Sequence, residues 1–86
     1  MKNNKTGFVF KNKHTNKYLI WVEMFPEWSA DTLEQAVVED DINQVVIDLM
    51  FLNGSGYSAN DYQLLYVDNN TINCVIDLDK ITFMFA

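Results

Sequence analysis

The sequence of 86 residues contains no arginine, one cysteine, one histidine and one proline. Because arginine is the residue best suited to bidentate contacts with phosphate, its absence counts against nucleic-acid binding. The single cysteine, Cys74, excludes an intramolecular disulfide and a cysteine-based zinc site. No apolar run has the length of a membrane span or of a signal peptide, so we expect a cytoplasmic protein without membrane contact.

The charges that are present are distributed unevenly along the chain. Five of the six lysines lie within the first 17 residues, whereas all 12 acidic residues lie between positions 23 and 79, and the net charge is −6. This division predicts a negative surface with a basic N-terminal corner, a feature that bears on partners rather than on fold. Lys11, Lys13 and Lys17 lie beside the aromatic residues Tyr18 and Trp21. We nevertheless expect no direct nucleic-acid binding there, because the many carboxylates would repel phosphate.

The length predicts a single domain over residues 1–86. A domain of this size buries only about 60% of the surface that its unfolded chain exposes. Hydrophobic residues nevertheless make up 49% of the chain, which is more than such a small interior needs. The surplus apolar surface favours an interface with a partner protein or with a second copy of the chain.

The order of the elements predicts an α+β fold with a single antiparallel sheet. Residues 7–11 and 17–22 are rich in aromatic and branched side chains and flank a polar turn, which is typical of a β-hairpin. The second of these strands is apolar on both faces, so we expect it at the centre of the sheet. One or two helices follow, with the main helix packed on one face. The remaining strands are predicted as a β-meander at 62–67, 72–78 and 81–86, with Asn69-Asn70 as the first tight turn.

Segment 40–54 has the strongest helix pattern in the sequence. Asp40 or Asp41 would cap its N-terminus, and Gly54 would close its C-terminus. At about 100° per residue, Gln44 and Asp48 lie opposite a broad apolar face. That face is predicted to consist of Ile42, Val45, Val46, Leu49, Met50 and Leu52.

Ile47 and Phe51 lie toward the polar side of this helix, four residues apart and therefore adjacent. If they are exposed, they form an apolar patch of the kind that marks an interface. Alternatively, segment 24–36 covers them. In that segment Pro26 ends an extended run, and residues 32–36 after Asp31 are predicted to form a short helix.

No group of residues in the sequence has the spacing of a catalytic or metal site. His14 is predicted in a turn, and Cys74 lies within a strand whose apolar neighbours would bury the thiol and keep it inert. The acidic runs at 39–41 and 77–79 lack the loop spacing of a calcium site. We therefore expect a non-enzymatic protein with no catalytic residue, no metal and no cofactor.

In residues 8–36, a Lys-Tyr-Leu strand follows a hairpin turn and precedes a tryptophan and a segment ending in Glu-x-Ala. The matching residues are Asn12, Thr15, Lys17, Tyr18, Leu19, Trp28, Leu33, Glu34 and Ala36. This pattern resembles the opening of small uncharacterised phage accessory proteins. The resemblance implies a phage protein in the host cytoplasm. Because small acidic phage proteins often inhibit host defence, it also implies an inhibitor of the anti-CRISPR or anti-restriction type.

The leading functional hypothesis is an acidic inhibitor that binds a basic surface on a host nucleic-acid-handling defence complex by mimicking nucleic-acid charge. The first alternative is a homodimeric structural or regulatory module. The second is a protein that sequesters a small ligand in a pocket lined by Trp21, Trp28 or tyrosines. The predicted partner-binding residues are Glu39, Asp40, Gln44, Ile47, Asp48, Phe51 and Asp61.

Overall fold

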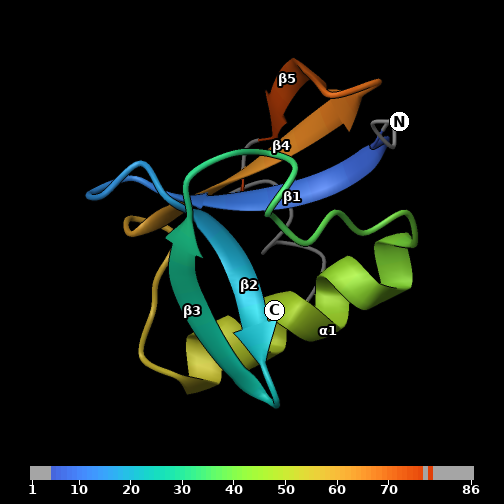
Figure 1. The fold of residues 1–86 in the computed structure, drawn as a ribbon. Helices are drawn as coiled ribbons and strands as arrows, with labels where there is room; N and C mark the ends of the chain where they lie inside the picture. Colours follow the sequence, from blue (N-terminus) through green and yellow to red (C-terminus); the bar gives the residue numbers. More distant parts are fainter. Residues whose placement is uncertain (1–4, 77, 79–86) are drawn as a thin grey trace.

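The computed structural model describes residues 5–76 and 78, and its main feature is a five-stranded antiparallel sheet (Figure 1). The strand order is β3-β2-β1-β4-β5, and every neighbouring pair is antiparallel. One helix lies against a face of this sheet, which confirms the predicted α+β class. The elements are β1 (Gly7–Asn12), β2 (Tyr18–Val22), β3 (Phe25–Ala30), α1 (Ile42–Gly54), β4 (Tyr62–Asp68) and β5 (Thr71–Ile76).

Strand β1, rather than β2, is the centre of the sheet. Its consecutive residues Val9 and Phe10 point to opposite faces, and both are buried. Strand β2 is an interior strand of the sheet, as predicted, although the expected coverage of both its faces is confined to its start. Strand β2 lies between β1 and the edge strand β3, and only its first two residues, Tyr18 and Leu19, are fully covered.

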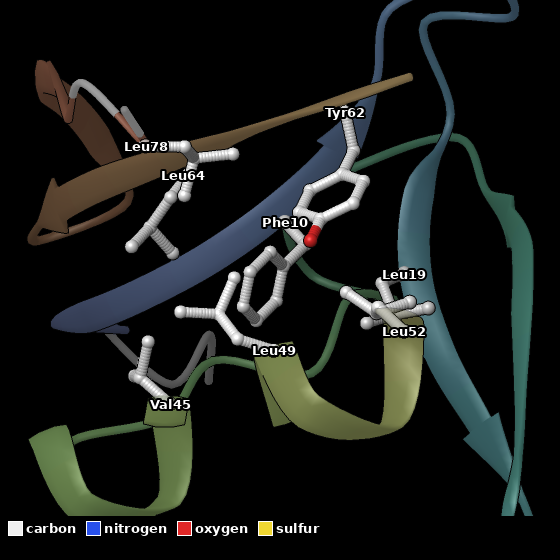
Figure 2. Packing of buried hydrophobic residues seen from close by; sticks show 8 residues of the cluster. All are labelled: Phe10, Leu19, Val45, Leu49, Leu52, Tyr62, Leu64 and Leu78. Carbon is white, nitrogen blue, oxygen red and sulfur yellow. The ribbon is translucent and has the colours of Figure 1, made fainter. Parts of the chain in front are cut away.

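The two faces of the sheet are covered by different parts of the chain. Helix α1 packs on one face, where its side chains meet the Phe10 and Tyr62 rings, whose centroids are 5.7 Å apart in an edge-to-face arrangement. The residues of this cluster are Phe10, Leu19, Val45, Leu49, Leu52, Tyr62, Leu64 and Leu78 (Figure 2). On the opposite face, the segment between β3 and α1 covers a second cluster through Ala36, with Leu33 and Val38 at its margin.

Helix α1 begins as its capping signals predict. Of the two candidate caps, the structure selects Asp41, whose carboxylate accepts a hydrogen bond from the backbone N–H of Asn43 at 2.9 Å. This bond satisfies one of the donors that the first turn leaves unpaired. The helix ends at Gly54, also as expected.

The segment that follows β2 differs from the prediction. Residues 25–30 form the edge strand β3 despite Pro26, which lies opposite Trp21 of β2. Proline is tolerated on an edge strand because its missing N–H need not contribute to the ladder on the solvent side. The short helix predicted at 32–36 is absent from the structure. That segment instead forms turns, with Ala36 N–H donating to the Leu33 carbonyl at 3.3 Å.

Strands β1 and β2 diverge, and the chain after Ala36 enters the gap between them. The N–H of Val37 donates to the carbonyl of Leu19 at 3.2 Å, and Glu39 exchanges two backbone bonds with Phe8, at 2.7 and 2.8 Å. Gly7 permits this approach, because a Cβ there would lie 2.4 Å from the Glu39 carbonyl oxygen. Segment 37–39 is thus wedged between two strands, and it leads directly into α1.

The β4–β5 hairpin has the predicted two-residue turn. Asn69 and Asn70 adopt φ values of 48° and 67°, the left-handed conformation that asparagine tolerates well. The register shifts opposite Tyr66 and Val67, which breaks the alternation expected for β5. Cys74 is exposed together with every other residue of β5 from Thr71 to Val75, so the prediction of a buried cysteine was wrong. The predicted final strand at 81–86 lies outside the described residues.

Candidate binding site

An apolar hollow lies between the β2–β3 turn and the C-terminal half of α1. It is lined by Met24, Phe25, Ile47, Met50, Phe51, Gly54 and Ser55, with a volume of about 600 Å³. Its side chains are well exposed, from 43% for Phe51 and 44% for Ile47 to 71% for Phe25. Met24 and Phe25 therefore do not cover the helix residues. They extend the apolar surface, so the structure favours the exposed patch over the covered one.

A smaller acidic–aromatic pocket adjoins this hollow, with Met24 and Phe51 shared between the two. Its volume is about 200 Å³. The lining residues are Trp21, Glu23, Met24, Glu39, Gln44, Asp48 and Phe51. Strands β2 and β3 curve toward α1 in Figure 1, and the pocket is lined by residues of β2, of the β2–β3 turn and of α1.

Each wall of the acidic–aromatic pocket comes from a different element. Strand β2 supplies Trp21, whose ring meets the Phe51 ring edge-to-face at a centroid distance of 6.2 Å. The β2–β3 turn supplies Glu23, whose φ of 59° is unusual for a residue with a side chain. The wedged segment supplies Glu39, and the first half of α1 supplies Gln44 and Asp48.

The position of Asp48 is the largest departure from the predicted helix. The sequence pattern placed it on the polar side, yet its side chain is only 3% exposed. At about 100° per residue Asp48 lies only about 60° from Val45, so it falls within the buried arc once Val45, Leu49 and Leu52 face the core. The other edge of the predicted apolar face, including Met50, is turned to solvent.

Within the part of the chain that the structure describes, one of the two Asp48 carboxylate oxygens has a hydrogen-bond partner. The side-chain amide of Gln44 donates to Oδ1 at 3.0 Å, whereas Oδ2 is buried and accepts no hydrogen bond from the described residues. Burial raises the pKa of Asp48 above its ordinary value, and the bond from Gln44 opposes this effect. A buried carboxylate in this state is stabilised by any cation that reaches it.

Glu39 lies beside this group and is affected by it. Burial raises the pKa of Glu39, and the negative charges of Asp48, Asp40 and Asp41 raise it further. Like charges that lie this close favour the binding of a counter-charge, because each carboxylate would otherwise destabilise the other. The pocket is therefore suited to a positively charged group.

The structure brings most of the predicted partner-binding residues into one region. Glu39, Gln44, Asp48 and Phe51 line the acidic–aromatic pocket, and Ile47 lines the adjoining hollow. Asp40 lines a different hollow, next to Lys5. Trp21, Glu23, Met24 and Phe25 were not among the predicted residues. Trp21 was predicted only as a lining residue of the ligand-sequestering alternative, and Met24 and Phe25 were missed because Pro26 was taken to end the extended run rather than to lie on an edge strand.

Asp61 lies apart from the other predicted residues. Its carbonyl accepts from the N–H of Lys13, after the C-terminal end of β1, whereas Glu39 pairs with Phe8 near the other end. Phe8 and Lys13 lie five residue steps apart along the extended chain, which corresponds to roughly 16 Å. The Asp61 carboxylate accepts from Ser58 N–H at 2.8 Å and contacts His14 Nε2 at 3.1 Å. These bonds hold the pKa of Asp61 below its ordinary value.

The lysines of the N-terminal corner are held by contacts within the chain. Lys5 donates to the carbonyls of Glu34 and Ala36, and Lys13 donates to the carbonyl of Ala59 at 3.1 Å. The remaining two described lysines also have partners. Lys17 forms an ion pair with Asp31, and Lys11 lies over the Tyr18 ring, 5.4 Å from its centroid.

The described residues also bear on the remaining chemical possibilities. Among residues 5–76 and 78, no three His, Cys, Asp or Glu side chains lie close enough to hold a metal ion. No helix in that part of the chain is both long and apolar enough to cross a bilayer. Of the two tryptophans named for the ligand-sequestering alternative, Trp21 lines the acidic–aromatic pocket, and Trp28 packs against two tyrosine rings. It stacks on Tyr62 with centroids 5.9 Å apart and meets Tyr57 edge-to-face at 5.6 Å.

The geometry of this region thus combines an open apolar hollow with a pocket that contains three carboxylates and two aromatic rings. The resemblance of residues 8–36 to phage accessory proteins stays a prediction. Comparison of the chain with protein-family models, with curated proteins and with solved structures gives no significant match.

Proposed function

We propose that this protein is a non-enzymatic binding module that docks a basic protein partner on the apolar hollow and the adjoining acidic–aromatic pocket. The observation that carries the proposal is the exposure of large apolar side chains from two elements around one hollow of about 600 Å³. Exposed apolar patches with polar rims are characteristic of interaction sites. Aromatic and methionine side chains are also enriched at the centres of interfaces.

The distribution of charge supports a basic partner. Residues 23–79 contain no lysine or arginine, and both elements that form the hollow belong to this stretch. A partner with positive charge around an apolar contact would associate faster and would be selected over acidic competitors.

The narrower partner that we propose is a nucleic-acid-handling complex of host defence. Support comes from the resemblance of residues 8–36 to phage accessory proteins and from the cation-free stretch, since such a complex offers a basic surface. Because Asp61 lies at the other end of β1 from Glu39, we favour a local contact anchored by apolar side chains. A continuous imitation of the phosphate backbone would require a longer acidic face.

The proposal is tested by capture from a bacterial host lysate with matched variants. Ile47 and Met50 are replaced together by serine in the test variant, while Ile72 and Val75, exposed on β5, are replaced by serine in the control. Exposed substitutions of this kind change stability by about 0.5 kcal/mol or less each, so both variants should fold.

We expect a basic protein to be captured by the wild type and by the control, and to be lost from the test variant. Binding of the purified pair should also weaken as the salt concentration rises, because surface charges are screened. Capture that is equal for both variants, or affinity that does not depend on salt, would contradict the proposal. Light scattering at several protein concentrations tests the homodimer alternative. If the wild type dimerises and the test variant does not, the hollow binds a second copy of the chain.

A further inference from the structure

The acidic–aromatic pocket has a feature that the apolar hollow alone does not explain. Asp48 is almost completely buried, and its Oδ2 accepts no hydrogen bond from residues 5–76 and 78, although the residue lines a cavity of about 200 Å³. Buried polar atoms without partners are rare in folded proteins, and each one needs a physical reason. One such reason is that a bound partner supplies the missing donor to this oxygen.

The pocket favours an organic cation over a metal ion. Glu23, Glu39 and Asp48 all line it, yet within the described residues no three such side chains converge closely enough to coordinate a metal. The cavity volume corresponds to about seven waters, which is enough for a side-chain head group and part of its stem. Carboxylates on one side and aromatic rings on the other suit a group that is both charged and flat.

The aromatic residues distinguish between the two basic side chains. Trp21 and Phe51 form adjacent walls with their rings at 70° to one another, so a planar cation can lie over one face and against the edge of the other. The guanidinium group is planar, stacks on aromatic rings and is more weakly hydrated than an ammonium group. Transfer of a guanidinium group from water to a site with a buried carboxylate therefore costs less hydration free energy than transfer of an ammonium group.

We propose that the acidic–aromatic pocket binds an arginine side chain of the protein partner, with the guanidinium group donating to Oδ2 of Asp48 and stacking against Trp21. This inference rests on the proposed function, because the arginine comes from the partner that occupies the apolar hollow. Met24 and Phe51 belong to both cavities, so an apolar segment seated in the hollow brings a neighbouring arginine to the pocket. Glu39 adds a second negative charge beside the guanidinium group.

The test uses small probes rather than the partner. The full chain, labelled with ¹⁵N, is titrated separately with the N-acetyl methylamides of arginine, lysine and citrulline, the last of which is a neutral isostere of arginine. We expect the arginine probe to shift the Trp21 indole and Gln44 side-chain amide signals and to bind more tightly than the lysine probe. Citrulline should leave both signals unchanged. Equal binding of citrulline, binding of lysine as tight as that of arginine, or unchanged signals with arginine would overturn the inference.

Two variants locate the interaction. Asp48→Asn should weaken binding of the arginine probe roughly tenfold or more, because a charge-assisted hydrogen bond is lost, and Glu39→Gln should weaken it to a smaller extent. Asp68→Asn, which removes one charge from an exposed position on β4 outside the pocket, is the matched control and should bind as the wild type does. Wild-type affinity in Asp48→Asn would refute the role of this carboxylate.

The outcomes separate this inference from the proposed function. The Ile47 and Met50 serine variant keeps all the pocket residues, so it should bind the arginine probe normally although it no longer captures the partner. If the wild type captures a partner through the hollow but does not bind the arginine probe, the inference fails and the proposed function stands. If the probe binds to Asp48 but no partner requires the hollow, the proposed function fails, and the pocket takes free organic cations instead.

Discussion

Replacement of Asp48 by asparagine should stabilise this protein at neutral pH. Asp48 is 3% exposed, and among the described residues only its Oδ1 has a partner, the Gln44 amide at 3.0 Å. A buried polar group without a partner costs about 1–3 kcal/mol, and a charged one costs more. Asparagine has nearly the same shape, keeps the acceptor for Gln44 and removes the buried charge, although its amide N–H groups then stand unpaired at the position of Oδ2. We therefore expect the free energy of unfolding to rise by about 1 kcal/mol or more, which raises Tm by roughly 4–8 °C in a domain of this size.

The pH dependence provides a second and more specific readout. Burial raises the pKa of Asp48 in the folded state above its ordinary value of 3.8. Well below pH 3.8 the carboxyl is protonated in both the folded and the unfolded state, so its charge does not lower the free energy of unfolding. As pH rises from 3.8 through the higher folded pKa, the unfolded state ionises first, and the free energy of unfolding falls. The advantage of Asp48→Asn should thus be small in acid and reach its full size above the folded pKa.

Glu39 also changes the free energy of unfolding in this pH range, so its contribution is measured with a separate variant. Burial and neighbouring charges raise the pKa of Glu39 as well, so part of the wild-type loss of stability with rising pH belongs to this residue. Glu39→Gln alone and together with Asp48→Asn separates the two contributions, since neighbouring charges are not additive.

The assay is urea unfolding followed by tryptophan fluorescence at about pH 3 and about pH 7. Asp61→Asn is the matched substitution, because the Asp61 carboxylate accepts hydrogen bonds from Ser58 and its pKa is lowered. It should destabilise the protein at neutral pH, and this effect should disappear as pH falls through the folded pKa of Asp61. The reasoning would be refuted if Asp48→Asn were less stable than the wild type at neutral pH, or if its advantage were the same at both pH values.

Three further predictions concern other parts of the chain. Gly7→Ala should destabilise the fold by more than about 1 kcal/mol, since the residue has a φ of 146° and the new Cβ would lie 2.4 Å from the Glu39 carbonyl oxygen; an unchanged Tm would contradict this. Lys5→Met should speed hydrogen exchange in the segment between β3 and α1, because the Lys5 ammonium group donates to the Ala36 carbonyl at 2.8 Å. Unchanged exchange would show that this bond is dispensable. Cys74 should react with a thiol reagent in the native protein nearly as fast as in urea, because it is exposed; strong protection in the native state would be inconsistent with that position.

Local signals in the sequence predicted the parts of the fold that depend on a few neighbouring residues. The Asn69-Asn70 turn follows from the tolerance of asparagine for positive φ, and both residues have it. The cap at Asp41 depends on one side-chain bond to a nearby N–H, so it too could be anticipated. The α+β class followed from the order of such segments along the chain.

Features that depend on distant segments could not be predicted. Pro26 is a strong local signal for the end of a strand, yet β3 contains it because the edge of a sheet does not require its N–H. The residues of β5 from Thr71 to Val75, Cys74 included, are all exposed, and no residue near Cys74 in the sequence predicts that this strand is left uncovered. Because β3 was not predicted, the structure was needed to place Met24 and Phe25 in the candidate site.

The sequence by itself determined the division of charge, the class of fold and the presence of more apolar surface than a small core needs. It did not determine which arc of α1 is buried, since apolar residues surround most of that helix and several rotations would bury a similar area. Packing against Phe10, Leu19 and Tyr62 selected the rotation, and that choice placed Asp48 in the interior and Ile47 in solvent. Burial is a property of two surfaces that meet, so a pattern within one segment cannot specify it.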